Sequence, residues 1–193
     1  MSRSRHTVAE ILAAPDNYEP WAVDTALWVR DQVSRPAPKL GRPGALCPYV
    51  PTAVERNTLT IVASDQPPQP RQALADVLLD EAGWLAEELG RTPVGRRVWV
   101  AHIVVFTQLG SAADVLAEVR AHVRPRLLRA GINVGEFFHD SPDTSVRNRH
   151  HLVGRSPWPC FALRVFMPQD ETFFRMTPDS EVGYLARGVG DRS

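Results

Sequence analysis

The residues best suited to chemistry in this chain are its two cysteines and six histidines. Cys47 lies in the segment GRPGALCPYVP, between a turn rich in glycine and proline and a further proline. The sequence leaves three roles open for this thiol: a buried structural side chain, one half of a disulfide with Cys160, or a thiolate ligand of a metal. A nucleophilic pair of either cysteine with His139 also stays open, because such pairs meet in space and not in sequence.

His139 is the histidine best placed for a functional role. It follows the apolar segment INVGEFF, residues 132–138, and opens the polar loop HDSPDTSVRN. Loops at strand ends often carry binding residues, because the strands hold them in position. The alternative is that Asp140, Ser141 and Asp143 only supply the chemistry of a turn.

Arg164 interrupts the apolar segment CFALRVFM, residues 160–167. A guanidinium group in such a strand needs a carboxylate or phosphate partner if it is buried. Asp170, Asp140 and Asp143 are the candidate partners. If this face of the strand is solvated, Arg164 contributes only to solubility.

The remaining histidines and the known motifs give weaker signals. His102 lies inside the apolar segment RVWVAHIVVF, so we expect a core histidine that is hydrogen-bonded to a neighbour. His150 and His151 are adjacent and point apart in an extended chain, which disfavours a shared metal. The sequence contains no CxxC, HExxH, GxGxxG, GxxxxGK[ST] or GxSxG motif. It therefore lacks the signatures of zinc sites, common nucleotide sites and α/β-hydrolases.

Composition indicates one globular domain without a polyanionic or membrane partner. The chain has 193 residues, 44% hydrophobic and 23% charged, and Lys+Arg and Asp+Glu both number 22. This balance gives no general attraction to nucleic acid or to an anionic membrane. No apolar run reaches the roughly 18 residues of a membrane span, and the N-terminus lacks the apolar core of a signal peptide. We therefore expect a cytoplasmic protein without a disulfide between its cysteines. The oligomeric state stays open, a homodimer included.

Apolar periodicity predicts the elements that must position these residues. We expect strands over 58–64, 97–106, 132–138 and 160–167, and helices over 20–34, 71–89 and about 111–130. A short first helix should begin at a capping box of Thr7 and Glu10. The order β-α-β-α-β-β predicts an α+β fold, near the ferredoxin-like type, with a mixed sheet and helices packed on one face.

The chain divides by composition into three parts. Residues 1–57 should form N-terminal helices and a loop that pack on the core, residues 58–176 the α+β sandwich, and residues 177–193 a polar tail. Residues 35–57 hold five prolines and two glycines, which predicts an ordered but irregular loop.

Three blocks of the sequence resemble a family of uncharacterised actinobacterial domains. The blocks are RPGALCPYVP, GINVGEFFHDSPDTSVRN and RSPWPCFALRVFMPQDETFF, and together they span about 41–174. The matching residues are Cys47, Pro48 and Tyr49; Gly131, Gly135 and Phe137; Arg155, Ser156, Pro157 and Pro159; and Arg164 with Asp170. A resemblance of this extent implies a shared fold.

This family is in turn similar to the small haem-dependent N-hydroxylases of natural-product pathways, which oxidise amine or guanidine groups of amino acids. The resemblance implies haem as cofactor, with Cys47 or His139 as the axial ligand and Tyr49 and Arg155 near the cofactor. Here Phe138 separates the histidine from the position that it takes in the family. The resemblance also implies catalytic roles for His139, Asp140, Arg164 and Asp170. Asp140, Asp143 or Asp170 would engage a cationic substrate, and Arg164 would meet a haem propionate or a substrate carboxylate.

The expected function is therefore a bacterial haem-dependent oxygenase or peroxygenase that acts on a small amine- or guanidine-bearing metabolite. The alternative is a non-enzymatic α+β binding or accessory domain, in which Cys47 is structural.

Overall fold

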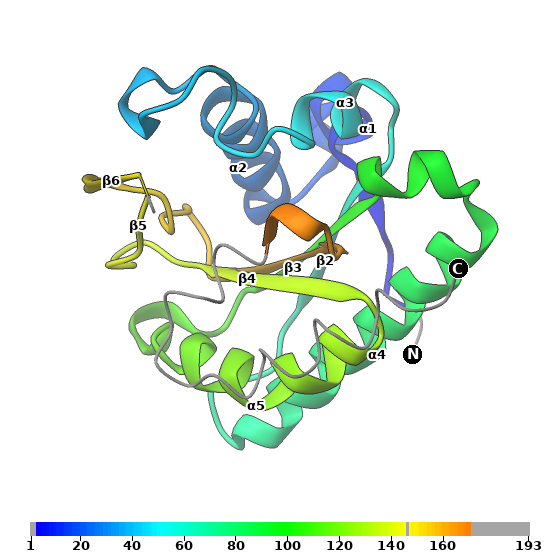
Figure 1. Ribbon diagram of the computed structural model, residues 1–193. Coiled ribbons are helices and arrows are strands. Elements are labelled where there is room, and N and C mark those ends of the chain that lie inside the picture. The colour runs from blue at the N-terminus through cyan, green and yellow to red at the C-terminus, as the bar shows by residue number, and fades with distance from the viewer. Residues whose placement is uncertain (1–2, 146, 171–193) are drawn as a thin grey trace.

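A five-stranded mixed sheet forms the centre of the protein, as a computed structural model shows for residues 3–145 and 147–170 (Figure 1). In spatial order its strands are β1 (His6–Thr7), β2 (Leu59–Ser64), β3 (Ala101–Phe106), β7 (Cys160–Val165) and β4 (Ile132–Phe137). β2 and β3 are parallel, and the other neighbouring pairs are antiparallel. The tail expected over 177–193 lies outside the described residues.

Two long helices cover one face of the sheet. They are α4 (Arg71–Arg91), which connects the parallel strands β2 and β3, and α5 (Val115–Arg129), which connects β3 to β4. Their apolar sides bury a core with one face of the strands, in which Leu78, Leu116 and Phe161 are fully enclosed. A parallel pair needs such a crossover connection, and a helix is its usual form.

The N-terminal helices cover the opposite face (Figure 1). These are α1 (Val8–Ala13), α2 (Pro20–Trp28), which continues into a π-helical turn over Val29–Val33, and α3 (Val50–Glu55). They enclose a second apolar cluster with the strand residues Ile61, Ile103 and Val105. Because both faces are covered, the central strands β2, β3 and β7 carry apolar residues at consecutive positions and not only at alternate ones.

Short elements complete the described fold. A hairpin of β5 (Thr144–Ser145) and β6 (Asn148–Leu152) stands apart from the main sheet. Turns of 3₁₀ helix occupy Pro15–Asn17, Pro38–Leu40, Val94–Trp99, Gly110–Ala112 and Pro168–Asp170. Of the helices in the described ranges, none combines the length and the apolar composition needed to cross a membrane.

The predicted α+β fold with a mixed sheet is confirmed, and so is the capping box of Thr7 and Glu10. Several element boundaries differ from the prediction. The strand predicted over 97–106 is β3, and it begins at Ala101, because a 3₁₀ turn over Val94–Trp99 precedes it. The loop over 35–57 contains α3, since Pro51 lies in the first helical turn, where its missing N–H group costs no hydrogen bond. The helix predicted over 71–89 runs to Arg91.

Candidate functional site

A cavity of about 670 Å³ lies at the end of the sheet where the strands β3 and β4 finish. Both strands run antiparallel to β7, so their carboxyl ends lie at the same end of the sheet, beside Cys160 at the start of β7. The loop after β3, the first turn of α5 and the loop after β4 therefore converge there. This convergence places the loop of His139 and Asp140 in the cavity wall.

Four acidic and two aromatic side chains line this cavity, together with proline, small and hydroxyl-bearing residues. The acidic residues are Glu136, Asp114, Asp140 and Asp143, and the aromatic ones are Phe138 and Trp158. Among the described residues that line the cavity there is no lysine or arginine, and His139 is the basic group. A cavity of this composition favours a cation over an anion.

Glu136 is the buried carboxyl of this set. Its residue is 5% exposed, and its Oε2 lies 2.6 Å from Nε of Arg120 on α5. Burial raises the pKa of Glu136, and the nearby Asp143 carboxylate raises it further, whereas Arg120 and Arg124 lower it. Burial prevails over the ion pair, and the resulting pKa is about 7. This carboxyl group therefore exchanges its proton near neutral pH.

The loop after β4 is held in place by its own backbone. The N–H of Phe138 donates to the carbonyl of Gly154 at 3.1 Å, and the N–H of Val153 donates to the carbonyl of Asp143 at 2.9 Å. A Cβ atom at Gly154 would come within 2.2 Å of Oγ of Ser141, so the chain segments pack too closely for a side chain. The loop after β4, which carries Asp140 and Asp143, is thus fixed to the segment that leads into β7.

A second cavity, of about 380 Å³, adjoins the first and shares His139 and Pro157 with it. It lies against α2 and the π-helical turn, and Trp28, Asp31 and Arg155 are among its lining residues. The His139 side chain is 85% exposed and stands 3.8 Å from Oδ1 of Asp140. His139 therefore lies at the rim between two cavities.

Arg164 and Asp170 form an ion pair at the other end of β7. Arg164 lies beside Ala101 and Asn133, near the beginnings of β3 and β4. Its two terminal nitrogens contact the Asp170 carboxylate at 2.8 and 2.5 Å. The Tyr49 ring lies 5.0 Å from the guanidinium carbon. Of the three partners predicted for Arg164, Asp170 is the one observed, and this pair lies apart from His139 and Asp140.

Both cysteines are free, as expected. Cys47 is half-buried and packs against the apolar cluster under the N-terminal helices, and it lines neither cavity. Cys160 is fully buried, and burial raises the pKa of its thiol to about 12, which removes it as a nucleophile at neutral pH. Within residues 3–145 and 147–170, no group of three or more His, Cys, Asp or Glu side chains could hold a metal ion.

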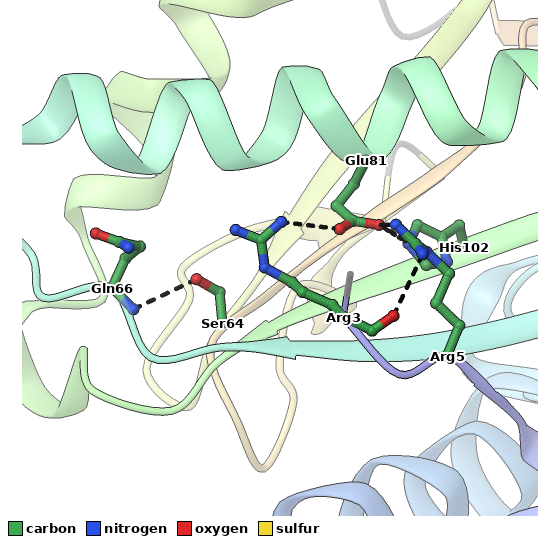
Figure 2. Close-up of polar contacts among 6 residues, drawn as sticks. All are labelled: Arg3, Arg5, Ser64, Gln66, Glu81 and His102. Carbon is green, nitrogen blue, oxygen red and sulfur yellow. Dashed lines mark hydrogen bonds and ion pairs between the residues drawn. The ribbon is translucent and has the colours of Figure 1, made fainter. Parts of the chain in front are cut away.

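His102 is the core histidine that the sequence predicts, and its partner is Glu81 of α4 (Figure 2). Both side chains are fully buried, with Nε2 of His102 2.9 Å from Oε2 of Glu81 and Nδ1 2.7 Å from Oγ1 of Thr60. Arg3 and Arg5 also contact the Glu81 carboxylate, at 3.1 and 2.8 Å. This network joins the N-terminal segment, α4 and the sheet, and its members line neither cavity.

Sequence reasoning missed Glu136 and Trp158 as members of the site. The signal for Glu136 was present, because it shares a strand face with the apolar Val134 and Phe138. An acidic side chain on such a face is either paired or functional. Trp158 gave no such signal, since its place in the wall depends on how the segment before β7 crosses the end of β4.

These features define an α+β domain with an acidic, aromatic cavity at the carboxyl ends of two strands. The chain belongs to the family described as a domain of unknown function, DUF6875, which it matches over residues 22–190. No curated protein matches the chain, and no solved structure does. The match agrees with the expected membership of an uncharacterised family that covers most of the chain. The similarity to haem-dependent N-hydroxylases stays a prediction.

Proposed function

We propose that this protein binds a small metabolite with an amine or guanidine group in the 670 Å³ cavity at the ends of β3 and β4. The observation that carries the proposal is the composition of the wall, in which four carboxyl groups and two aromatic rings surround a cavity of ligand size.

The depth of the carboxyl groups suggests how a cation would be held. Asp114, Asp140 and Asp143 are exposed at the rim, where they raise the local concentration of cations. Glu136 is buried, so a hydrogen bond from an ammonium or guanidinium group to it would be little screened by water. The rings of Trp158 and Phe138, which also line the cavity, would add attraction for the same positive charge.

The proposal is tested by calorimetric titration of the full chain with agmatine, putrescine and arginine. We expect measurable binding of at least one of these cations and none of glutarate, a dianion of similar size, because the rim repels it. Equal binding of glutarate, or binding of none of the cations, would contradict the proposal.

Haem-dependent oxidation of the bound amine is the second candidate function, and it rests on the sequence resemblance. Of the two predicted ligands, His139 suits this role better than Cys47, because His139 borders both cavities and Cys47 borders neither. Arg155 lines the same cavity as His139, where its guanidinium group would suit a haem propionate. When bound, haem would supply the oxidising chemistry, and Glu136 and the rim would orient the amine.

The absorption spectrum of the protein titrated with hemin tests this second function. We expect a Soret band that His139→Ala abolishes and Cys47→Ala leaves in place. The absence of a Soret band would exclude the oxygenase function. Metabolite binding would remain, and the protein would be a binding or accessory domain with a structural Cys47. Since both cysteines are free, we place either function in the reducing cytoplasm.

A further inference from the structure

Two ribbons that are distant in the sequence lie side by side on one side of the molecule (Figure 1). The first is the loop 36–45, closed by a bridge between Pro36 and Ala45, and the second is the β5–β6 hairpin. The Asn148 side-chain amide donates to the carbonyl of Lys39 at 2.6 Å. From the other strand of the hairpin, Oγ of Ser145 donates to the carbonyl of Leu40 at 3.5 Å.

The two ribbons together form a basic corner, which we define by Lys39, Arg42, Arg147, Arg149 and His150. All are exposed except the half-buried Arg42. Their segments contribute no acidic residue, since none occurs between 32 and 54 or between 144 and 169. Within the described ranges, none of the five forms an ion pair.

The positive charge of the corner is held in place without a counter-charge. The Arg42 guanidinium donates to the carbonyls of Pro43 and Leu46, at 3.1 and 2.9 Å, and these are neutral acceptors. The formal net charge of the whole protein is +0, so this local excess is balanced by acidic groups elsewhere. Such an excess attracts a partner of opposite charge.

The backbone of β6 adds a second kind of binding capacity. In the described part of the chain, β6 pairs only with β5, through Ser145 with Asn148 and Thr144 with Leu152. Residues 149–151 lie between these two pairs, at an irregularity of the ladder, and the N–H of His150 donates to Oδ1 of Asn148 at 3.0 Å. The register pairs none of these three residues with β5, and an extended segment without a strand partner can accept another one. Leu152 is 37% exposed at the end of the same strand, where it offers an apolar contact.

We propose that the basic corner docks an acidic, extended segment of a partner protein, which lies along β6. The lysine and arginine side chains would pair with its carboxylates, the peptide groups of Arg149 and His151 with its backbone, and Leu152 with an apolar side chain. The last two features favour a polypeptide over a nucleic acid, which would use the charges alone. This proposal is independent of the function of the cavity.

Fluorescence anisotropy with a labelled peptide of alternating glutamate and valine residues tests the proposal on the full chain. We expect saturable binding that weakens as salt rises, and slower amide hydrogen exchange at 149–151 in the complex. The double variant Arg147→Glu/Arg149→Glu should lose affinity by about tenfold or more. The matched control Arg126→Glu/Arg129→Glu makes the same charge change on the exposed side of α5 and should bind as the wild type does.

A second variant, Lys39→Glu/Arg42→Glu, probes the neighbouring ribbon and should weaken binding in the same way. Circular dichroism verifies the fold of each variant. Three results would overturn the proposal: equal loss of affinity in the control, unchanged exchange at 149–151, or equally tight binding of a DNA duplex with the same number of charges.

Discussion

Replacement of Glu81 by alanine is expected to lower the free energy of unfolding by about 3 kcal/mol. The substitution removes the acceptor of a fully buried His102 ring nitrogen and the common partner of Arg3 and Arg5. A buried polar network that loses one member leaves the others desolvated and unpaired. The arginine head groups are partly exposed and regain water in the variant. The loss of stability therefore lies at the low end of the range for breaking a buried ion pair. Urea denaturation measures it.

Glu87→Ala is the matched control, because Glu87 is an exposed glutamate on the same helix. Its free energy of unfolding should change by no more than about 0.5 kcal/mol. Glu81→Gln, which keeps the shape and loses the charge, should fall between the two. If Glu81→Ala unfolds at the urea concentration of the control, the network does not stabilise the fold as described.

The pH dependence of unfolding gives an independent readout of the same network. Burial raises the pKa of Glu81, but the hydrogen bonds from His102 and Arg5 outweigh it and lower the pKa from 4.5 to about 2. The unfolded chain therefore binds the proton first, and this stabilisation, complete above pH 4.5, is lost as the pH falls towards 2. For His102, burial lowers the pKa below 6.5, so the unfolded chain again binds the proton first and stability begins to decline as the pH falls below 6.5. The free energy of unfolding of Glu81→Ala should therefore lack the decline that the Glu81 carboxyl causes between pH 4.5 and 2.

Glu136→Gln is expected to lower the affinity for a cationic metabolite at pH 8 by about 10- to 100-fold, provided that the cavity binds one as proposed. The pKa of Glu136 is about 7, so the group is ionised at pH 8 and largely protonated at pH 6. Wild-type affinity for agmatine should therefore decrease as the pH falls through 7, because protonation removes the charge that pairs with the cation. Titration at both pH values measures the change, and the glutamine variant should show little of it.

Other titratable groups face Glu136 or the same cavity and need a control. Arg120, Arg124 and Asp143 act on the charge of Glu136, and His139 lies at the rim of the same cavity. His139→Gln should retain the pH dependence if Glu136 causes it. Glu55→Gln, an exposed substitution outside the cavity, should bind agmatine as the wild type does. A pH dependence that survives Glu136→Gln would assign it to another group.

The α+β fold was accessible from the sequence, because each helix and strand carries its own apolar pattern and its own end signals. The run 97–106 is apolar on both faces and therefore predicts a central strand, which β3 is. The short strand β1 and the β5–β6 hairpin escaped prediction. β1 and β5 have two residues each and no measurable periodicity, and the five residues of β6, NRHHL, show no apolar alternation. Their existence depends on which chain segment lies beside them.

The sequence by itself also determined that His102 would be a satisfied core residue and that a buried Arg164 would need a carboxylate. Only the tertiary structure decided that the partners are Glu81 and Asp170. It also separated Arg164 and Asp170 from His139 and Asp140, which the resemblance had grouped as one catalytic set. The physical reason is that local patterns define elements, whereas strand order and direction decide which loop ends meet. β3 and β4 both run against β7, and this common direction brings Glu136, Asp143 and Trp158 around one cavity.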